Sequence, residues 1–120
     1  MSSPIRNKAI FSTLAATLVF GFSSNVMAVD AKAAQALMKK SDCFKCHSVD
    51  KKKDGPPFME TAKEYKDKYK DNMAEAEQKL YTHLTTNPKV EVDGVEEEHT
   101  SLKTKNDADI RNVVQWILSH

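Results

Sequence analysis

A run of five residues, Cys43-Phe44-Lys45-Cys46-His47, constrains this chain of 120 residues more than any other feature. Two cysteines three positions apart lie on the same side of a helical turn, so both thiols can reach one edge of a porphyrin and form thioethers. His47 follows at once and brings an imidazole nitrogen under the iron, where it can serve as an axial ligand. The motif predicts one covalent haem c per chain, bound by Cys43, Cys46 and His47, with His47 as a metal ligand.

Other uses of two nearby cysteines fit the sequence less well. A redox dithiol is expected in a βαβ context, which the chain lacks, and it would leave His47 without a role. A structural zinc site usually draws on a second Cys or His pair, but the chain has only two cysteines. A disulfide between Cys43 and Cys46 would close too short a loop to add much stability.

The N-terminal segment has the features of a secretory signal peptide. Arg6 and Lys8 precede an apolar stretch over residues 9–22, and Val26-Met27-Ala28 supplies a cleavage site. A retained membrane anchor is the alternative, but the apolar stretch is shorter than the ~20 residues that span a bilayer. We therefore expect residues 1–28 to be a signal peptide, cleavage after Ala28, and a periplasmic protein.

The remaining chain, residues 29–120, is long enough for a single small domain. An apolar core of this size is marginal, and a covalently bound haem would enlarge it. The 18 basic and 17 acidic residues nearly balance, so nothing indicates a nucleic-acid partner. We predict an all-α fold in which about four helices surround one haem.

The predicted helices cover residues 29–43, 58–69 and 73–86, and a last helix is capped by Asn106 or Asp107. Between them, residues 48–57 contain Asp54-Gly55-Pro56-Pro57 and form a turn, and residues 89–106 form a long polar loop of the kind that often carries function. We see no strand-like alternation. The apolar stripe of the 73–86 helix comprises Met73, Ala76, Leu80, Tyr81 and Leu84, and that of the last helix comprises Ile110, Val113, Val114, Trp116 and Ile117.

Together, the C-x-x-C-H motif, the Gly55-Pro56 turn and the terminal helix resemble a class I c-type cytochrome over the whole of residues 29–120. The resemblance implies a soluble monohaem electron carrier in which the first and last helices cross, with Leu37 and Trp116 near the crossing. It also implies that a backbone carbonyl of Gly55 or Pro56 accepts the N–H of the His47 imidazole.

The sequence departs from this family at the sixth iron ligand. The family methionine lies in the loop before the last helix, but no methionine of this chain lies there; the five are Met1, Met27, Met38, Met59 and Met73. The loop contains His99 instead, close to the family position. We therefore predict His47 and His99 as the two metal ligands. The alternatives are Met59, Met73, His83, Lys103 and an open distal site.

Two imidazole ligands predict a low-potential electron carrier, because a second imidazole favours ferric iron more than a thioether does. Six-coordinate iron offers no open position to a substrate, so we expect no enzyme and no catalytic residues. The expected partners are periplasmic redox proteins or membrane oxidoreductases, met by a monomer without stable membrane insertion after cleavage. The alternative function is a haem-based protein that binds or senses a small ligand by displacing a weak distal ligand.

Charged residues form two segments of opposite sign. Lysines predominate between residues 39 and 54, on the cysteine side of the predicted site: Lys39, Lys40, Lys45, Lys51, Lys52 and Lys53. Acidic residues predominate in the loop that contains His99: Glu91, Asp93, Glu96, Glu97 and Glu98. This asymmetry either steers redox partners or keeps a small protein soluble.

Overall fold

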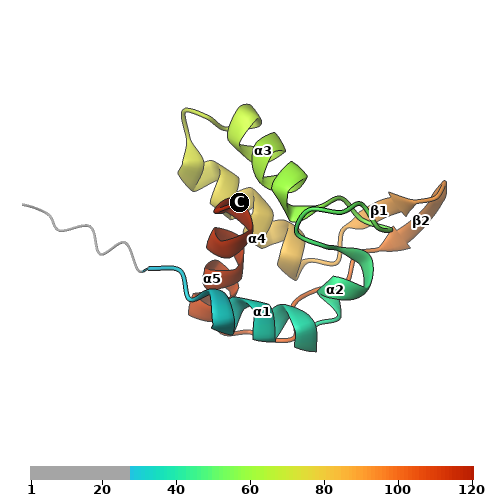
Figure 1. The fold of residues 1–120 in the computed structure, drawn as a ribbon, viewed down its shortest axis with the longest axis horizontal. Coiled ribbons are helices and arrows are strands. Elements are labelled where there is room, and N and C mark those ends of the chain that lie inside the picture. The colour runs from blue at the N-terminus through green and yellow to red at the C-terminus, as the bar shows by residue number, and fades with distance from the viewer. Residues whose placement is uncertain (1–27) are drawn as a thin grey trace, which may run out of the picture.

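A computed structural model describes residues 28–120, which form five helices and one β-hairpin (Figure 1). The predicted signal peptide therefore lies outside the described residues, apart from Ala28. The elements are α1 Ala31–Lys40, α2 Cys43–Cys46, α3 Phe58–Lys68, α4 Met73–Thr85, β1 Lys89–Val92, β2 Val95–Glu98 and α5 Asp107–Leu118. The predicted small helical fold is confirmed, with a hairpin added to it.

Three helices begin at a short polar side chain that caps the free backbone N–H groups of the first turn. The Asp30 carboxylate accepts a hydrogen bond from the N–H of Ala33 at the start of α1. Asn72 and Asn106 do the same for α4 and α5. Of the two cap residues considered for the last helix, Asn106 is therefore the correct one.

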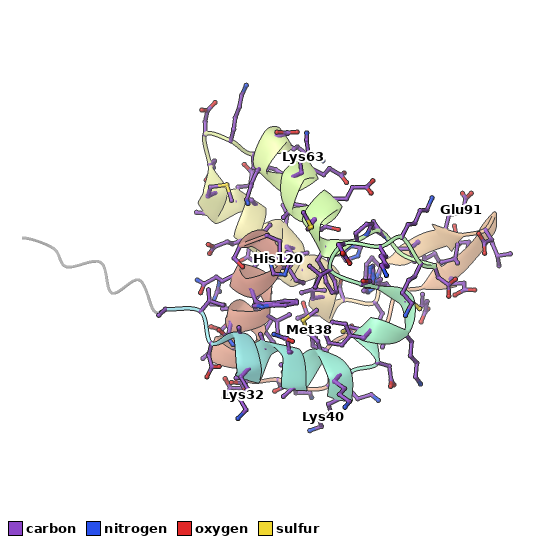
Figure 2. The ribbon with its side chains drawn as sticks, in the orientation of Figure 1. Lys32, Met38, Lys40, Lys63, Glu91 and His120 are labelled. Atoms are coloured by element: carbon purple, nitrogen blue, oxygen red, sulfur yellow. The ribbon has the colours of Figure 1, made fainter. Side chains whose placement is uncertain are left out.

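The first and last helices pack against each other, as the resemblance implied (Figure 1). A reciprocal pair of hydrogen bonds fastens their contact: Asn112 accepts from the Asp30 N–H and donates to the Asp30 carbonyl, both at 2.9 Å. Met38 points from α1 into the body while Lys32 and Lys40 point away from it (Figure 2). All five predicted apolar residues of α5 are buried, and Leu37 packs against the core.

Phe58, the first residue of α3, connects three parts of the core. Its ring makes edge-to-face contacts with Phe44 of α2, at a centroid distance of 6.0 Å, and with Trp116 of α5, at 5.7 Å. It also stacks on the His47 imidazole at 5.2 Å. Such aromatic contacts prefer defined angles, so Phe58 fixes the position of the C-x-x-C-H segment relative to the helices.

The prediction that residues 89–106 are irregular is wrong for their first part, which forms the β1–β2 hairpin. Its turn is Asp93-Gly94, whose φ angles are 51° and 81°, and two consecutive positive values are typical of a type I′ hairpin turn. The register places Val90 opposite Glu97 and Val92 opposite Val95. Val90 and Val92 are half-buried on one face of β1, whereas Lys89 and Glu91 are exposed. This is the period-two alternation of a strand, which the many glutamates obscure in the sequence.

Two further expectations are corrected. The predicted helix over 29–43 ends at Lys40, because Asp42 adopts a left-handed conformation with φ 64° and separates α1 from α2. Met73 does not point inward, since it is 38% exposed at the first turn of α4. Ala76, Leu80 and Leu84 of the same stripe are buried, as predicted.

Ser41 joins the α1–α2 turn to the loop before α5. It is fully buried, and its Oγ accepts a hydrogen bond of 2.9 Å from the backbone N–H of Lys103. We expect Ser41→Ala to lower the free energy of unfolding by about 1–3 kcal/mol, because the Lys103 N–H then loses its acceptor inside the protein. Urea unfolding of the holoprotein measures this loss.

Ser48→Ala is the matched control, since the Ser48 hydroxyl makes only a 3.5 Å contact with Asp50. Its expected effect is within about 0.5 kcal/mol. Equal stabilities of the two variants would show that the Ser41 hydrogen bond does not hold the loop.

Candidate haem site

The loop that precedes α3 holds the imidazole of His47 through a hydrogen bond to Nδ1. Its Nδ1 lies 2.7 Å from the carbonyl oxygen of Pro56. A carbonyl can only accept, so Nδ1 carries the hydrogen and Nε2 keeps the lone pair that a metal ion needs. The implied hydrogen bond is thus present, and Pro56 rather than Gly55 supplies it.

Gly55 forms the surface on which this imidazole lies. A Cβ atom at position 55 would come within 2.3 Å of the His47 Cε1, a distance that no side chain can occupy. The Gly55 N–H donates to the Cys46 carbonyl at 2.8 Å, which holds the loop against α2. Only glycine allows this close approach of backbone and ring.

The two cysteines lie beside His47 and are not joined by a disulfide. Burial raises the pKa of the Cys43 thiol to about 11, and the nearby Asp42 carboxylate adds to the rise. A redox dithiol needs a thiol that ionises easily. This environment therefore argues against dithiol chemistry, whereas thioether attachment to a haem remains compatible with it.

His99 lies at the end of β2, and its backbone is anchored to the end of α4. Its N–H donates to the Pro88 carbonyl at 2.8 Å, and its carbonyl accepts from the Asn87 side chain at 3.0 Å. Farther along the loop, the Leu102 N–H donates to the Leu84 carbonyl. These bonds hold the His99 side chain beside α4, although it belongs to a connecting segment.

The rings of His47 and His99 lie across one cavity, with their centroids 6.1 Å apart. A metal–imidazole bond is about 2.0–2.1 Å long and the ring centroid lies roughly 1 Å behind its nitrogen, so two imidazoles on one metal ion have centroids about 6 Å apart. Their separation therefore fits an iron ion between them. Nδ1 of His99 is enclosed by protein, so Nε2 is the nitrogen left to bind a metal ion.

The cavity has a volume of about 380 Å³, within the range of about 300–1,000 Å³ typical of ligand pockets. Residues from all five helices and the hairpin line it, and most of the lining surface is apolar. They include Met38, Cys43, Cys46, Phe58, Tyr65, Leu80, Leu84, Val90, Val92, Val113 and Ile117. An apolar planar group held by Cys43 and Cys46 and ligated on both faces fits these residues.

The alternative ligands differ in whether they line the cavity. Met59 is 53% exposed, Met73 is also exposed, and neither lines the cavity. The Lys103 amine pairs with the Asp42 carboxylate at 3.1 Å, and Lys103 is not among the residues that line the cavity. His83 does line the cavity, and its ring contacts that of His99 at a centroid distance of 4.6 Å. Sequence reasoning missed this contact, for which the spacing gives no signal.

Both distal imidazoles are held in the neutral form. Burial lowers the pKa of His99 below its usual value, the charges of His83 and His47 lower it further, and the Thr100 backbone partly offsets this. Burial and then the charge of His47 lower the pKa of His83. A neutral imidazole is the form that binds a metal ion, so this environment favours ligation.

Two charged surfaces lie near the cavity, one formed by lysines and one by acidic residues. Lys51 and Lys52 lie in the exposed loop after His47, whereas Lys53 donates a 2.6 Å hydrogen bond to the Phe44 carbonyl. The hairpin carries the acidic run, and Figure 2 shows Glu91 on this projecting hairpin. Lys89 and Glu96 form an ion pair across its strands.

The family model for cytochrome c matches residues 31–120, and the chain belongs to the cytochrome c family. Membership implies a covalently attached haem c. Among solved structures, the chain is similar to the class 1 cytochrome MtoD from Sideroxydans lithotrophicus ES-1, with 46% sequence identity and a TM-score of 0.69. The match covers 77% of this chain and 97% of that one. A comparison with curated protein sequences gives no match.

Replacing Gly55 by alanine tests the role of this residue. We expect Gly55→Ala to displace the His47 ring, because the new methyl group would occupy its position. The folded holoprotein should then show mixed-spin or altered low-spin absorption and a reduced yield.

Gly94→Ala serves as the control, because a Cβ there meets no atom of residues 28–120 within 4 Å and costs only about 1–2 kcal/mol of backbone strain at φ 81°. Its absorption spectrum should equal that of the wild type. A Gly55→Ala protein with unchanged spectrum and yield would contradict the assigned packing.

Proposed function

We propose that this protein is a one-electron carrier with a single haem c, attached through Cys43 and Cys46 and ligated by His47 and His99. The observation that carries the proposal is the pair of imidazoles 6.1 Å apart across a cavity that both cysteines line. The bound haem supplies a ferric/ferrous couple. The family match and the similarity to a class 1 cytochrome support electron transfer as its use.

The residues that hold the two iron ligands determine the reduction potential of this couple. Pro56 orients His47, and the backbone bonds to Asn87 and Pro88 hold His99. Two imidazole ligands favour ferric iron and lower the reduction potential relative to a His/Met site. They also leave no open position for a substrate, so a non-enzymatic role follows.

We further propose a periplasmic location after removal of residues 1–28. Cleavage after Ala28 would leave α1 intact together with its capping residue Asp30. Within residues 28–120, none of the helices is long and apolar enough to cross a membrane. The expected partners are periplasmic redox proteins or membrane oxidoreductases.

His99→Met tests the proposed distal ligand. The ferric wild type should lack the weak near-infrared band of sulfur-to-iron charge transfer, and the variant should gain it. The potential should rise by a part of the ~0.8 V range that axial ligands set, since a thioether favours ferrous iron.

Removal of the ligand is tested in the double variant His83→Leu/His99→Ala, because the neighbouring imidazole could otherwise replace His99. It should become high-spin and bind carbon monoxide rapidly, whereas His120→Ala should match the wild type. A double variant that stays low-spin would place the ligand elsewhere. Rapid formation of a carbon monoxide adduct by the wild type would instead support a small-ligand sensor.

The exposed lysines near the motif are expected to attract anionic partners. Lys51→Glu/Lys52→Glu should slow oxidation of the ferrous protein by hexacyanoferrate about tenfold at low salt, because steering depends on local charge. Added salt should reduce the difference, since the Debye length is about 10 Å at 0.1 M. The charge-matched control is Lys32→Glu/Lys63→Glu, on the outer faces of α1 and α3 (Figure 2). Equal rates for both variants would make Lys51 and Lys52 ordinary solvated surface.

A further inference from the structure

His83 and His99 come from different elements and meet at one wall of the cavity. Their ring centroids are 4.6 Å apart, with an angle of 54° between the ring planes. His83 belongs to the last turns of α4, whereas His99 follows β2. Both side chains line the cavity, so a third imidazole is present beside the two proposed iron ligands.

The imidazole of His99, the proposed distal ligand, requires a hydrogen-bond acceptor for its Nδ1 atom. Nδ1 of His99 is buried and has no hydrogen-bond partner among residues 28–120. When Nε2 of a neutral imidazole binds a metal ion, the hydrogen is on Nδ1, and a buried N–H requires an acceptor. On the proximal side, the Pro56 carbonyl meets the same need of His47 at 2.7 Å.

We propose that His83 is a positioning residue for the distal ligand, accepting the Nδ1 hydrogen of His99 and fixing the plane of its ring. This inference rests on the proposed ligation of iron by His47 and His99. His83 is the side chain that contacts the His99 ring and offers an acceptor nitrogen. The Thr100 backbone is the other nearby acceptor that acts on His99, and among residues 28–120 neither it nor His83 completes a hydrogen bond with Nδ1 in this structure.

The geometry of α4 suits this role. His83 lies in the last turn of α4, and Asn87 follows two residues after this helix ends at Thr85. Asn87 binds the His99 carbonyl, and the adjacent Pro88 binds the His99 N–H. One end of α4 thus places both the backbone and the ring of the ligand, which gives a loop residue the precision of a helical one.

An acceptor on Nδ1 makes the imidazole a stronger donor to iron and stabilises the ferric state. Loss of that acceptor should raise the reduction potential and weaken the His99–iron bond. A change in ring orientation should also shift the g values of the low-spin ferric signal in electron paramagnetic resonance.

The test compares holoproteins carrying His83→Leu and His83→Gln. His83→Leu should raise the potential, shift the g values and increase the affinity of the ferric protein for cyanide, which displaces His99, by about 10-fold to 100-fold. His83→Gln should lie closer to the wild type, because its amide oxygen can accept the same hydrogen. The control His120→Gln alters a half-buried histidine that packs on Trp116 and does not line the cavity. It should leave all three properties unchanged.

Potential, g values and cyanide affinity that remain at wild-type values in His83→Leu would overturn the proposal and leave the Thr100 backbone as the sufficient partner. If His83→Leu does not fold, wild-type values of all three properties in His83→Phe overturn it, because a phenylalanine side chain has no acceptor for the Nδ1 hydrogen. Failure of the ligation itself is a separate outcome, because His99→Met would then introduce no sulfur-to-iron band whatever residue occupies position 83.

Discussion

The hydrogen bond from His47 Nδ1 to the Pro56 carbonyl is the interaction on which the rest of the site depends. It fixes the tautomer of the proximal imidazole and leaves Nε2 with the lone pair that binds a metal ion. Gly55 supports the face of the ring, and Phe58 stacks on it. Because Phe58 also packs on Trp116, the orientation of this imidazole is tied to the core that α5 forms.

The proposed distal ligand, His99, is held in a different way from His47. His99 sits in a connecting segment, yet the end of α4 holds it by backbone hydrogen bonds to Asn87 and Pro88. The hairpin that precedes it adds Val90 and Val92 to the cavity wall. Hydrogen bonds therefore fix the position of this long connecting segment, and it places His99 across the cavity from His47.

Most helices could be predicted from the sequence, because their apolar periodicity and capping residues are local signals. Asn106 and the buried face of α5 are examples. The hairpin was missed because four glutamates obscure the valine alternation, although Asp93-Gly94 is a known turn signal. The choice of the Pro56 carbonyl and the contact of His83 with His99 could not be predicted, since both depend on how distant segments meet in space. His99 itself remains a prediction, which its place across from His47 supports.

X-ray absorption at the iron edge of the wild-type holoprotein tests the central claim most directly. Ligation by His47 and His99 predicts a first shell of nitrogen atoms alone at about 2.0 Å, with four from the porphyrin and two from imidazoles. Met38 lines the cavity and is the methionine best placed to compete. A sulfur atom at about 2.3 Å from the iron, or a five-coordinate shell, would contradict the account.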